Sequence, residues 1–119
     1  MTERMRRVNE AMRAVLSEAV PALKDPRIGF VTVTGVETTN DLEHATVYVS
    51  VLGSEKKRQG SLAGLTAARG VLQGQVAREL RLRRTPQLTF AYDPSVEHGI
   101  YMSKLIDDLA PRDEEPDPS

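Results

Sequence analysis

The chain has 119 residues, of which 39% are hydrophobic and 28% charged, and its formal net charge at pH 7 is -1. This length suits one domain with its own core, and the absence of cysteine excludes disulfides, thiolate metal ligands and cysteine nucleophiles. No stretch approaches the ~20 apolar residues that span a bilayer. The charged start also lacks the apolar run of a signal peptide, so we expect a soluble, cytoplasmic protein.

The charge is unevenly distributed along the chain. Residues 107–119 contain six acidic residues and one arginine, which leaves 15 basic and 11 acidic residues in 1–106. Arginine supplies 12 of the 16 basic residues, and its fork of donors can engage two phosphate oxygens at once. Nucleic-acid binding and an ordinary solvated basic surface both fit this charge.

The first half of the chain predicts one helix and two strands. Apolar residues recur every three or four positions from 4 to 23, which indicates an amphipathic helix that Pro21 ends or distorts. Residues 24–27 read as a turn, and residues 28–37 and 43–52 as strands rich in valine and threonine. The short polar turn between these strands predicts an antiparallel hairpin with one buried face.

The second half predicts a broken helix and a third strand. Residues 54–82 have helical periodicity but contain Gly64, Gly70 and Gly74, so we expect two helices that meet at a kink near Gly70. Residues 88–92 alternate as a strand, and Ser95 could cap a short C-terminal helix that runs through Leu109. The expected organisation is a folded domain over 1–110 and an acidic, proline-containing disordered tail over 111–119.

This order of elements, helix-strand-strand-helix-helix-strand, matches the type II KH arrangement, an α+β RNA-binding fold with a three-stranded sheet. KH modules ordinarily clamp the nucleic-acid backbone with a GxxG loop. The chain contains no GxxG, and Ala68-Arg69-Gly70 stands at the expected helix junction.

With its flanking segments, this junction resembles the ribosome-binding factor A family, whose KH-like domain has an Ala-x-Gly kink in place of the GxxG loop. The likeness runs from about Arg7 to Leu109. Its motifs, in order, are Lys24-Asp25-Pro26-Arg27, Val31-Thr32-Val33-Thr34-Gly35-Val36-Glu37, Ala45-Thr46-Val47-Tyr48-Val49, Leu80-Arg81-Leu82-Arg83, Thr85-Pro86-Gln87-Leu88-Thr89-Phe90 and Tyr92-Asp93-Pro94-Ser95. Each motif is weak alone, and the series in one small domain is specific.

The resemblance implies a bacterial ribosome assembly factor that binds the free small (30S) subunit and its 16S rRNA during late maturation and leaves before translation. It also implies help in maturing the 5′ end of that rRNA and a role in growth at low temperature. We expect a monomer that needs no cofactor or metal, does not associate with a membrane and has no small-molecule substrate.

The candidate RNA-binding residues are arginines, because phosphate contacts must compensate for the missing GxxG loop. Three of them belong to the two helices predicted over residues 54–82. Arg69 lies in the kink, and a spacing of three puts Arg78 and Arg81 on one helical face. Ala68 and Gly70 form the kink itself, where Gly70 is expected to allow close helix packing. The full set is Arg69, Arg78, Arg81, Arg83 and Arg84, with Arg4, Arg6 and Arg7 as a second patch and Lys56, Lys57 and Arg58 as a weaker third one.

Other interpretations stay open for several of these residues. Arg81 and Arg83 could pair with carboxylates, and the 56–58 group suits a solvated loop or helix start. Tyr48, Phe90 and Tyr92 lie on predicted strands, which favours core packing over base stacking.

Three other functions remain to be weighed. An enzyme is disfavoured because the two histidines, His44 and His98, match no catalytic or metal-binding motif. A protein-binding adaptor could use the edge of the sheet. A KH-like RNA binder acting away from the ribosome also remains open, and only the resemblance argues against it.

Overall fold

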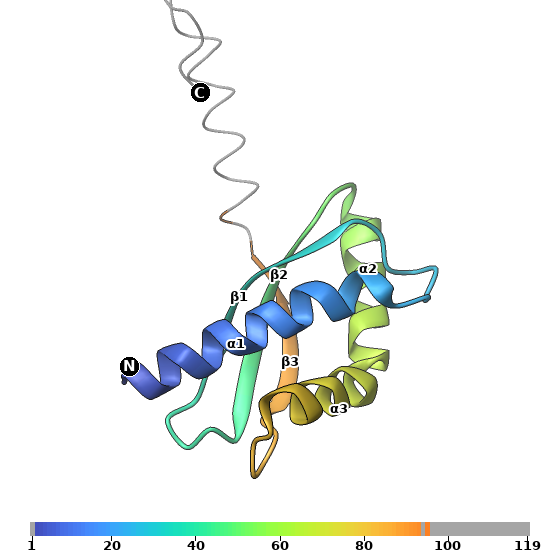
Figure 1. Cartoon of the computed structure of the whole chain (residues 1–119). Coiled ribbons are helices and arrows are strands. Elements are labelled where there is room, and N and C mark those ends of the chain that lie inside the picture. Colours follow the sequence, from blue (N-terminus) through green and yellow to red (C-terminus); the bar gives the residue numbers. More distant parts are fainter. Residues whose placement is uncertain (1, 94, 96–119) are drawn as a thin grey trace, which may run out of the picture.

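The structure, a computed structural model, describes residues 2–93 and 95. It has the predicted order of elements (Figure 1). In sequence these are α1 (Glu3–Ala19), a 3-10 turn η1 (Val20–Ala22), β1 (Val31–Thr38), β2 (His44–Val51), α2 (Glu55–Ala67), α3 (Arg69–Leu80) and β3 (Gln87–Tyr92). The predicted C-terminal helix and acidic tail lie outside the described residues, apart from Ser95.

The three strands form one mixed sheet in the order β1-β2-β3. β1 and β2 are antiparallel, as the predicted hairpin requires, and β2 and β3 are parallel. In the central strand, Val47 therefore pairs with Val36 on one side and with Phe90 on the other. The α+β fold class is confirmed, with the crossover between the two parallel strands formed by α2 and α3.

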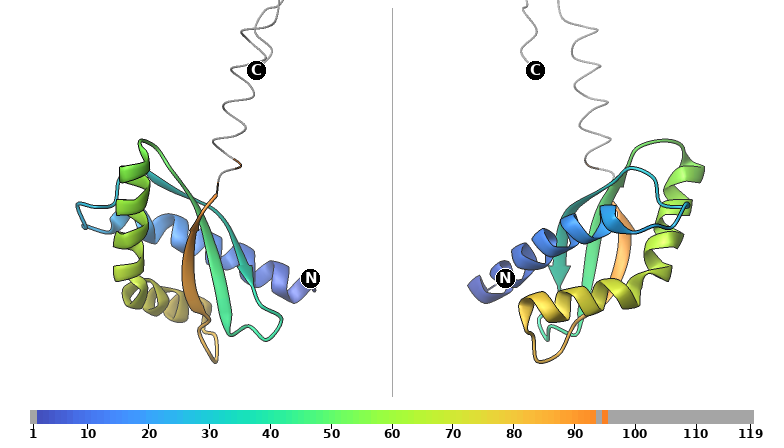
Figure 2. Two further views of the ribbon diagram at one scale, coloured as in Figure 1. Left: turned by 180° about the vertical axis from the view of Figure 1, so that it is seen from behind. Right: turned by 45° about the vertical axis from the view of Figure 1, so that its right-hand side comes forward.

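One face of the sheet is covered by α1 and α3, and α2 stands beside β3 (Figures 1 and 2). Seen from behind, the sheet lies in front of α1 and α3, and none of the described helices covers that side (Figure 2). The covered face holds the core, because alternate residues of each strand point to it. Side chains of the core that are almost completely buried include Met12, Leu16, Val47, Val49, Leu72, Val76 and Leu88.

The ends of α1 follow from local chemistry. Thr2 caps the helix, since its hydroxyl accepts a hydrogen bond from the Met5 N–H at 3.1 Å. The regular helix ends at Ala19, and Pro21 lies in the 3-10 turn that follows. Within the described residues, no helix has the length and apolarity needed to cross a membrane.

The start of the first strand and close packing at Gly70 differ from expectation. The first strand begins at Val31 rather than at residue 28, and Phe30 is 81% exposed. The two expected helices do meet near Gly70, and the break lies at Ala68, whose backbone has φ -89° and ψ 5° and whose N–H bonds back to the Gly64 carbonyl. Close packing at Gly70 is not found, because a Cβ placed there would meet nothing within 4 Å.

Candidate nucleic-acid interface

The first candidate arginine follows directly on the helix break. Arg69 is the first residue of α3, and its side chain is half-buried next to the junction at Ala68. Its Nε atom is buried and has no hydrogen-bond partner in the part of the chain that the structure describes. Gly70, one residue further, is exposed. The junction therefore presents a small, open surface with one guanidinium at its base.

Arg78 and Arg81 do not share a helical face, contrary to the expectation from their spacing. α3 ends at Leu80, and Arg81 adopts a left-handed conformation with φ 49° and ψ 41°. Its N–H bonds to the Ala77 carbonyl and closes the helix. Arg78 stays on the helix, where its Nη2 donates to Gln75 Oε1 at 3.2 Å. The left-handed turn directs the chain away from α3 and into the loop before β3.

That loop, residues 81–86, carries three exposed arginines and is held by two apolar residues. Leu82 packs against the core and Pro86 is fully buried, which fixes the loop at both ends. The next strand is then held by the Leu88 N–H, which donates to Gln73 Oε1 at 3.0 Å on α3. Arg81, Arg83 and Arg84 thus project from a loop whose position is set by buried apolar residues.

The loop lies beside the turn that joins β1 and β2. The Gln87 N–H donates to the Glu43 carbonyl at 2.8 Å, and Arg84 Nη1 lies 3.6 Å from Glu43 Oε1. The Arg84 side chain is 83% exposed, so this ion pair is weak and leaves most of the guanidinium in water. The sequence alone gives no signal for Glu43, since the contact arises from the parallel register of β2 and β3.

The second arginine group lies at the start of α1. Arg6 Nη2 pairs with Glu3 Oε1 at 2.5 Å and Arg7 Nε lies 3.5 Å from the same oxygen, while Arg4 has no partner within residues 2–93 and 95. The Glu3 carboxylate raises the pKa of Arg6, which stays charged. This group therefore keeps its positive charge and is partly neutralised by one acid.

The fold brings the arginines of the 81–86 loop and those of α1 to the same end of the sheet, whereas Arg69 lies at the far end of α3. Asn9 ties α1 to the last residue of β1, because its Oδ1 accepts from the Thr38 N–H at 3.1 Å and from the Thr38 hydroxyl at 2.8 Å. Thr38 pairs with Ala45 at the start of β2, and His44 pairs with Gln87 at the start of β3. The arginines of α1 precede Asn9 by two to five residues, which is about 3–8 Å along the helix.

Between the groups stands the acidic β1–β2 turn. Asp41 Oδ1 accepts from the Thr39 hydroxyl at 2.5 Å and from the Glu43 N–H at 3.0 Å. The hydrogen bond from Thr39 is the main cause of a lowered pKa for Asp41, which therefore stays ionised. An RNA that contacts both arginine groups must bridge or avoid this turn, because its carboxylates repel phosphate.

The third, weaker group lies at the opposite end of β2. Lys56, Lys57 and Arg58 occupy the first turn of α2, which Ser54 caps by accepting from the Lys57 N–H at 3.3 Å. Arg58 pairs with Glu55 at 2.5 Å and lies over the ring of Tyr92, 4.0 Å from its centroid. The group therefore lies at a helix start rather than in a loop, and Arg58 packs on Tyr92.

The aromatic side chains of the sheet are wholly or partly buried. Phe90 is buried, Tyr92 is half-buried under Arg58, and Tyr48 is half-buried with its hydroxyl 3.4 Å from Glu37 Oε2. Among the residues that the structure describes, no group of three or more His, Asp or Glu side chains is placed to hold a metal ion. What the site offers is a set of guanidinium groups on a rigid sheet end.

The chain is similar to known proteins over most of its length. The family model for "Ribosome-binding factor A" matches residues 4–106. A curated relative of that name from Geobacter metallireducens is 43% identical over 110 residues, which are 92% of this chain and 93% of the relative.

Solved structures of related proteins share the fold. The crystal structure of ribosome-binding factor A from Thermus thermophilus has a TM-score of 0.68 and 32% identity, covering 74% of this chain and 93% of the other. The solution structure of a protein from Thermotoga maritima, described as a putative ribosome binding factor A, has a TM-score of 0.69 and 34% identity over 75% and 86% of the two chains. A homology model of the Thermus thermophilus ribosome binding factor A, fitted into the cryo-EM map of its complex with 30S, has a TM-score of 0.62 and 32% identity over 72% and 91% of the two chains. On these matches, together with the fold, the chain belongs to the ribosome-binding factor A family.

Proposed function

We propose that the protein binds the free small ribosomal subunit and its 16S rRNA during late assembly and leaves before translation. The related Thermus thermophilus factor fitted into a map of a 30S complex is the observation that carries this proposal. The shared fold makes the same kind of contact available to this chain, and the region matched by the family model includes both arginine groups.

The contacts are proposed to be made by the arginines at the end of the sheet where β3 begins. Arg4, Arg81 and Arg83 have no acidic partner within residues 2–93 and 95, so their guanidinium groups are available to phosphate. A guanidinium can bind a phosphate through two parallel hydrogen bonds, which gives both affinity and orientation. Arg69, Arg78 and Arg84 extend this surface along α3 and its loop, and Arg6 and Arg7 extend it along α1.

Finer aspects of the function are part of the same proposal. Binding at this site would aid processing of the rRNA 5′ end by holding the RNA in a form that a separate nuclease cleaves, because the protein itself is proposed to be non-catalytic. It would act as a monomer in the bacterial cytoplasm and support growth at low temperature, where misfolded RNA escapes more slowly.

Sedimentation of tagged protein with cell extract on a density gradient tests the proposal. The expected result is comigration with free small subunits, absence from joined ribosomes, and release at high salt, because phosphate contacts weaken steeply with salt. Protein found only at the top of the gradient, with subunits present, would remove the ribosomal assignment. An RNA binder away from the ribosome, or a protein adaptor, would then be the better description.

Paired variants locate the contact. Arg81→Ala with Arg83→Ala removes two unpaired charges, and Arg13→Ala with Arg27→Ala removes the same charge from arginines that already pair with Glu10 and Asp25. We expect the first variant to lose about tenfold in subunit affinity or more, since each phosphate contact contributes to counterion release. Equal affinity of the two variants would place the RNA contact elsewhere.

A further inference from the structure

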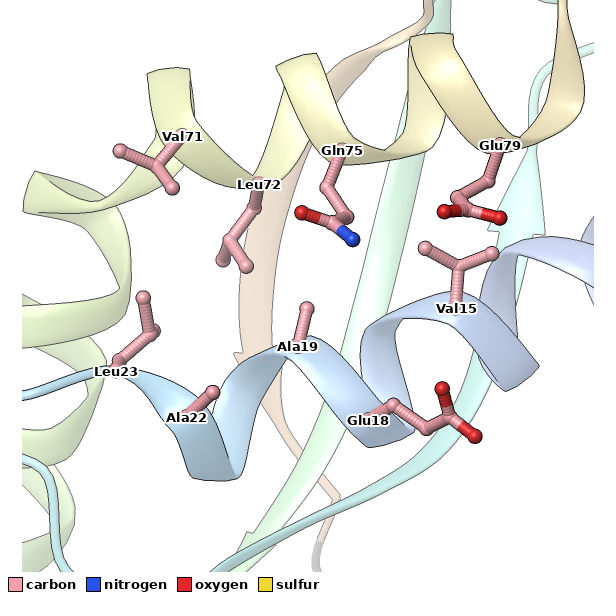
Figure 3. Close-up of a pocket in the computed structure, with 9 residues that line it drawn as sticks. All are labelled: Val15, Glu18, Ala19, Ala22, Leu23, Val71, Leu72, Gln75 and Glu79. Carbon is pink, nitrogen blue, oxygen red and sulfur yellow. The ribbon is translucent and has the colours of Figure 1, made fainter.

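Helices α1 and α3 border a groove that the proposed RNA contacts do not use. Its volume is about 370 Å³, and its walls come from the second half of α1, the 3-10 turn and α3 (Figure 3). Ala19 and Ala22 line the α1 side, and such small side chains leave room between the two helices.

One end of the groove is apolar. Leu23 and Val71 face each other across it, with Leu72 beside them (Figure 3). Val71 is 65% exposed, which is unusual for a valine in a helix that packs on the core with Leu72 and Val76. This end offers a site for one apolar side chain of a partner.

The other end of the groove is acidic. Glu18 comes from α1 and Glu79 from α3, and both lie near Val15 (Figure 3). Neither carboxylate has a hydrogen-bond or ion-pair partner within residues 2–93 and 95. Two unpaired carboxylates on facing helices attract a cation and repel phosphate.

The middle of the groove is lined by the amide of Gln75. Arg78 donates to Gln75 Oε1 at 3.2 Å and so fixes the side chain from outside the groove. The amide NH₂ group remains available to a carbonyl oxygen in the groove. Among the described residues, no basic side chain lines the groove itself.

We propose that this groove binds a basic polypeptide segment that carries an apolar anchor, the chemistry of the basic extensions of small-subunit ribosomal proteins. The choice of a ribosomal protein as the source rests on the proposed function, whereas the choice of a basic, apolar peptide rests on the groove alone. Val71 and Glu79 are about 12 Å apart along α3. A matching helix therefore has an apolar residue and a cation seven or eight positions apart, and a matching extended segment has them about four apart.

Photocrosslinking on the small subunit tests the partner class. The photoreactive variant Val71→p-benzoylphenylalanine is bound to purified small subunits and irradiated. A crosslink to a basic ribosomal protein supports the proposal, and a crosslink to RNA, or none while the subunit is bound, overturns it.

Charge reversal tests the acidic end. Glu18→Lys with Glu79→Lys should lower the crosslink yield about tenfold, because two attractive contacts become repulsive. Glu10→Lys with Glu37→Lys adds the same charge outside the groove and should leave the yield unchanged. Added positive charge strengthens phosphate binding in general, so a loss confined to the groove variant points to a cationic partner. Equal yields in the two variants contradict the proposal.

A peptide titration tests the groove without the ribosome. If the protein does not bind small subunits, the proposed function is contradicted, but the groove can still be tested with a peptide. The probe is a capped, alanine-based 14-residue peptide that contains two leucines and two arginines. Each arginine lies eight positions from one of the leucines. We expect it to shift the methyl signals of Val15 and Val71 in NMR spectra of the free protein. No shift, or equal binding of a peptide with glutamate in place of arginine, overturns the proposal.

Discussion

Gly64 of α2 packs so closely on Ile28 that a Cβ at position 64 would lie 2.6 Å from Ile28 Cγ1. The same Cβ would lie 3.4 Å from Asp25 Cγ. Through this contact, α2 holds the segment that leads into β1, and the helix can approach only because residue 64 has no side chain.

Gly64→Ala and Gly70→Ala should therefore change the free energy of unfolding in opposite directions. Alanine at 64 forces Ile28 aside and should lower the free energy of unfolding by about 1–3 kcal/mol. Alanine at 70 meets nothing within 4 Å and should raise it by up to about 1 kcal/mol, because alanine is the better helix former. Urea denaturation measures both, and an equal loss at both positions would contradict the placement of the close contact.

Asn9→Ala should destabilise the fold by about 1–3 kcal/mol, because it leaves the N–H and hydroxyl of Thr38 without their acceptor. Both residues are buried, so water cannot readily replace the amide oxygen. Asn40→Ala, in the exposed β1–β2 turn, is the control and should change stability by less than about 0.5 kcal/mol. A melting temperature for Asn9→Ala equal to that of the control would refute the role of this bond.

Arg81→Gly should raise the thermal stability of the protein and lower its affinity for small subunits. The left-handed backbone of Arg81 costs a non-glycine residue about 1 kcal/mol, so glycine should stabilise the protein while removing one charge of the proposed RNA contact. Arg81→Ala removes the same charge without relieving the backbone. We expect both variants to lose the same affinity for small subunits and only the glycine variant to melt higher than wild type.

Asp25 should make the fold sensitive to acid. The side chain of Arg27, and then its backbone N–H, hydrogen-bond the carboxylate and lower the pKa of Asp25 to about 2. An unfolded aspartate titrates near 3.9, so the contribution to stability is complete above about pH 4 and is lost as the pH falls toward 2. Asp25→Asn should melt below wild type at neutral pH, and the gap should close over that acidic range. A gap that persists at pH 2 would assign the effect to something other than ionisation.

The sequence predicts the elements whose pattern is local. The alternation of residues 45–51 places β2 within a residue of its observed bounds, because every second side chain must enter the core. Propensity alone cannot tell which of Gly64, Gly70 and Gly74 meets a neighbour. That choice depends on Ile28, which is far away in the sequence, and so the expectation of close packing falls on the wrong glycine.

The candidate site shows the same limit. Arginine composition draws attention to the loop at residues 81–84 as a candidate site. Nothing local marks Arg81 as left-handed, and so the predicted shared face with Arg78 is wrong. The meeting of both arginine groups at one end of the sheet follows from strand register and from the Asn9–Thr38 bond. These are long-range features that spacing along the chain does not carry.

Because β3 pairs in parallel with β2, the core cannot close until the chain has been synthesised through Tyr92. On a translating ribosome, α1 and the β1–β2 hairpin emerge first, and hairpins form quickly because their contacts are local. Leu88 and Phe90 arrive last, and with them the anchors that fix the arginine loop. A nascent chain therefore lacks the assembled arginine surface until β3 has left the ribosome and paired with β2.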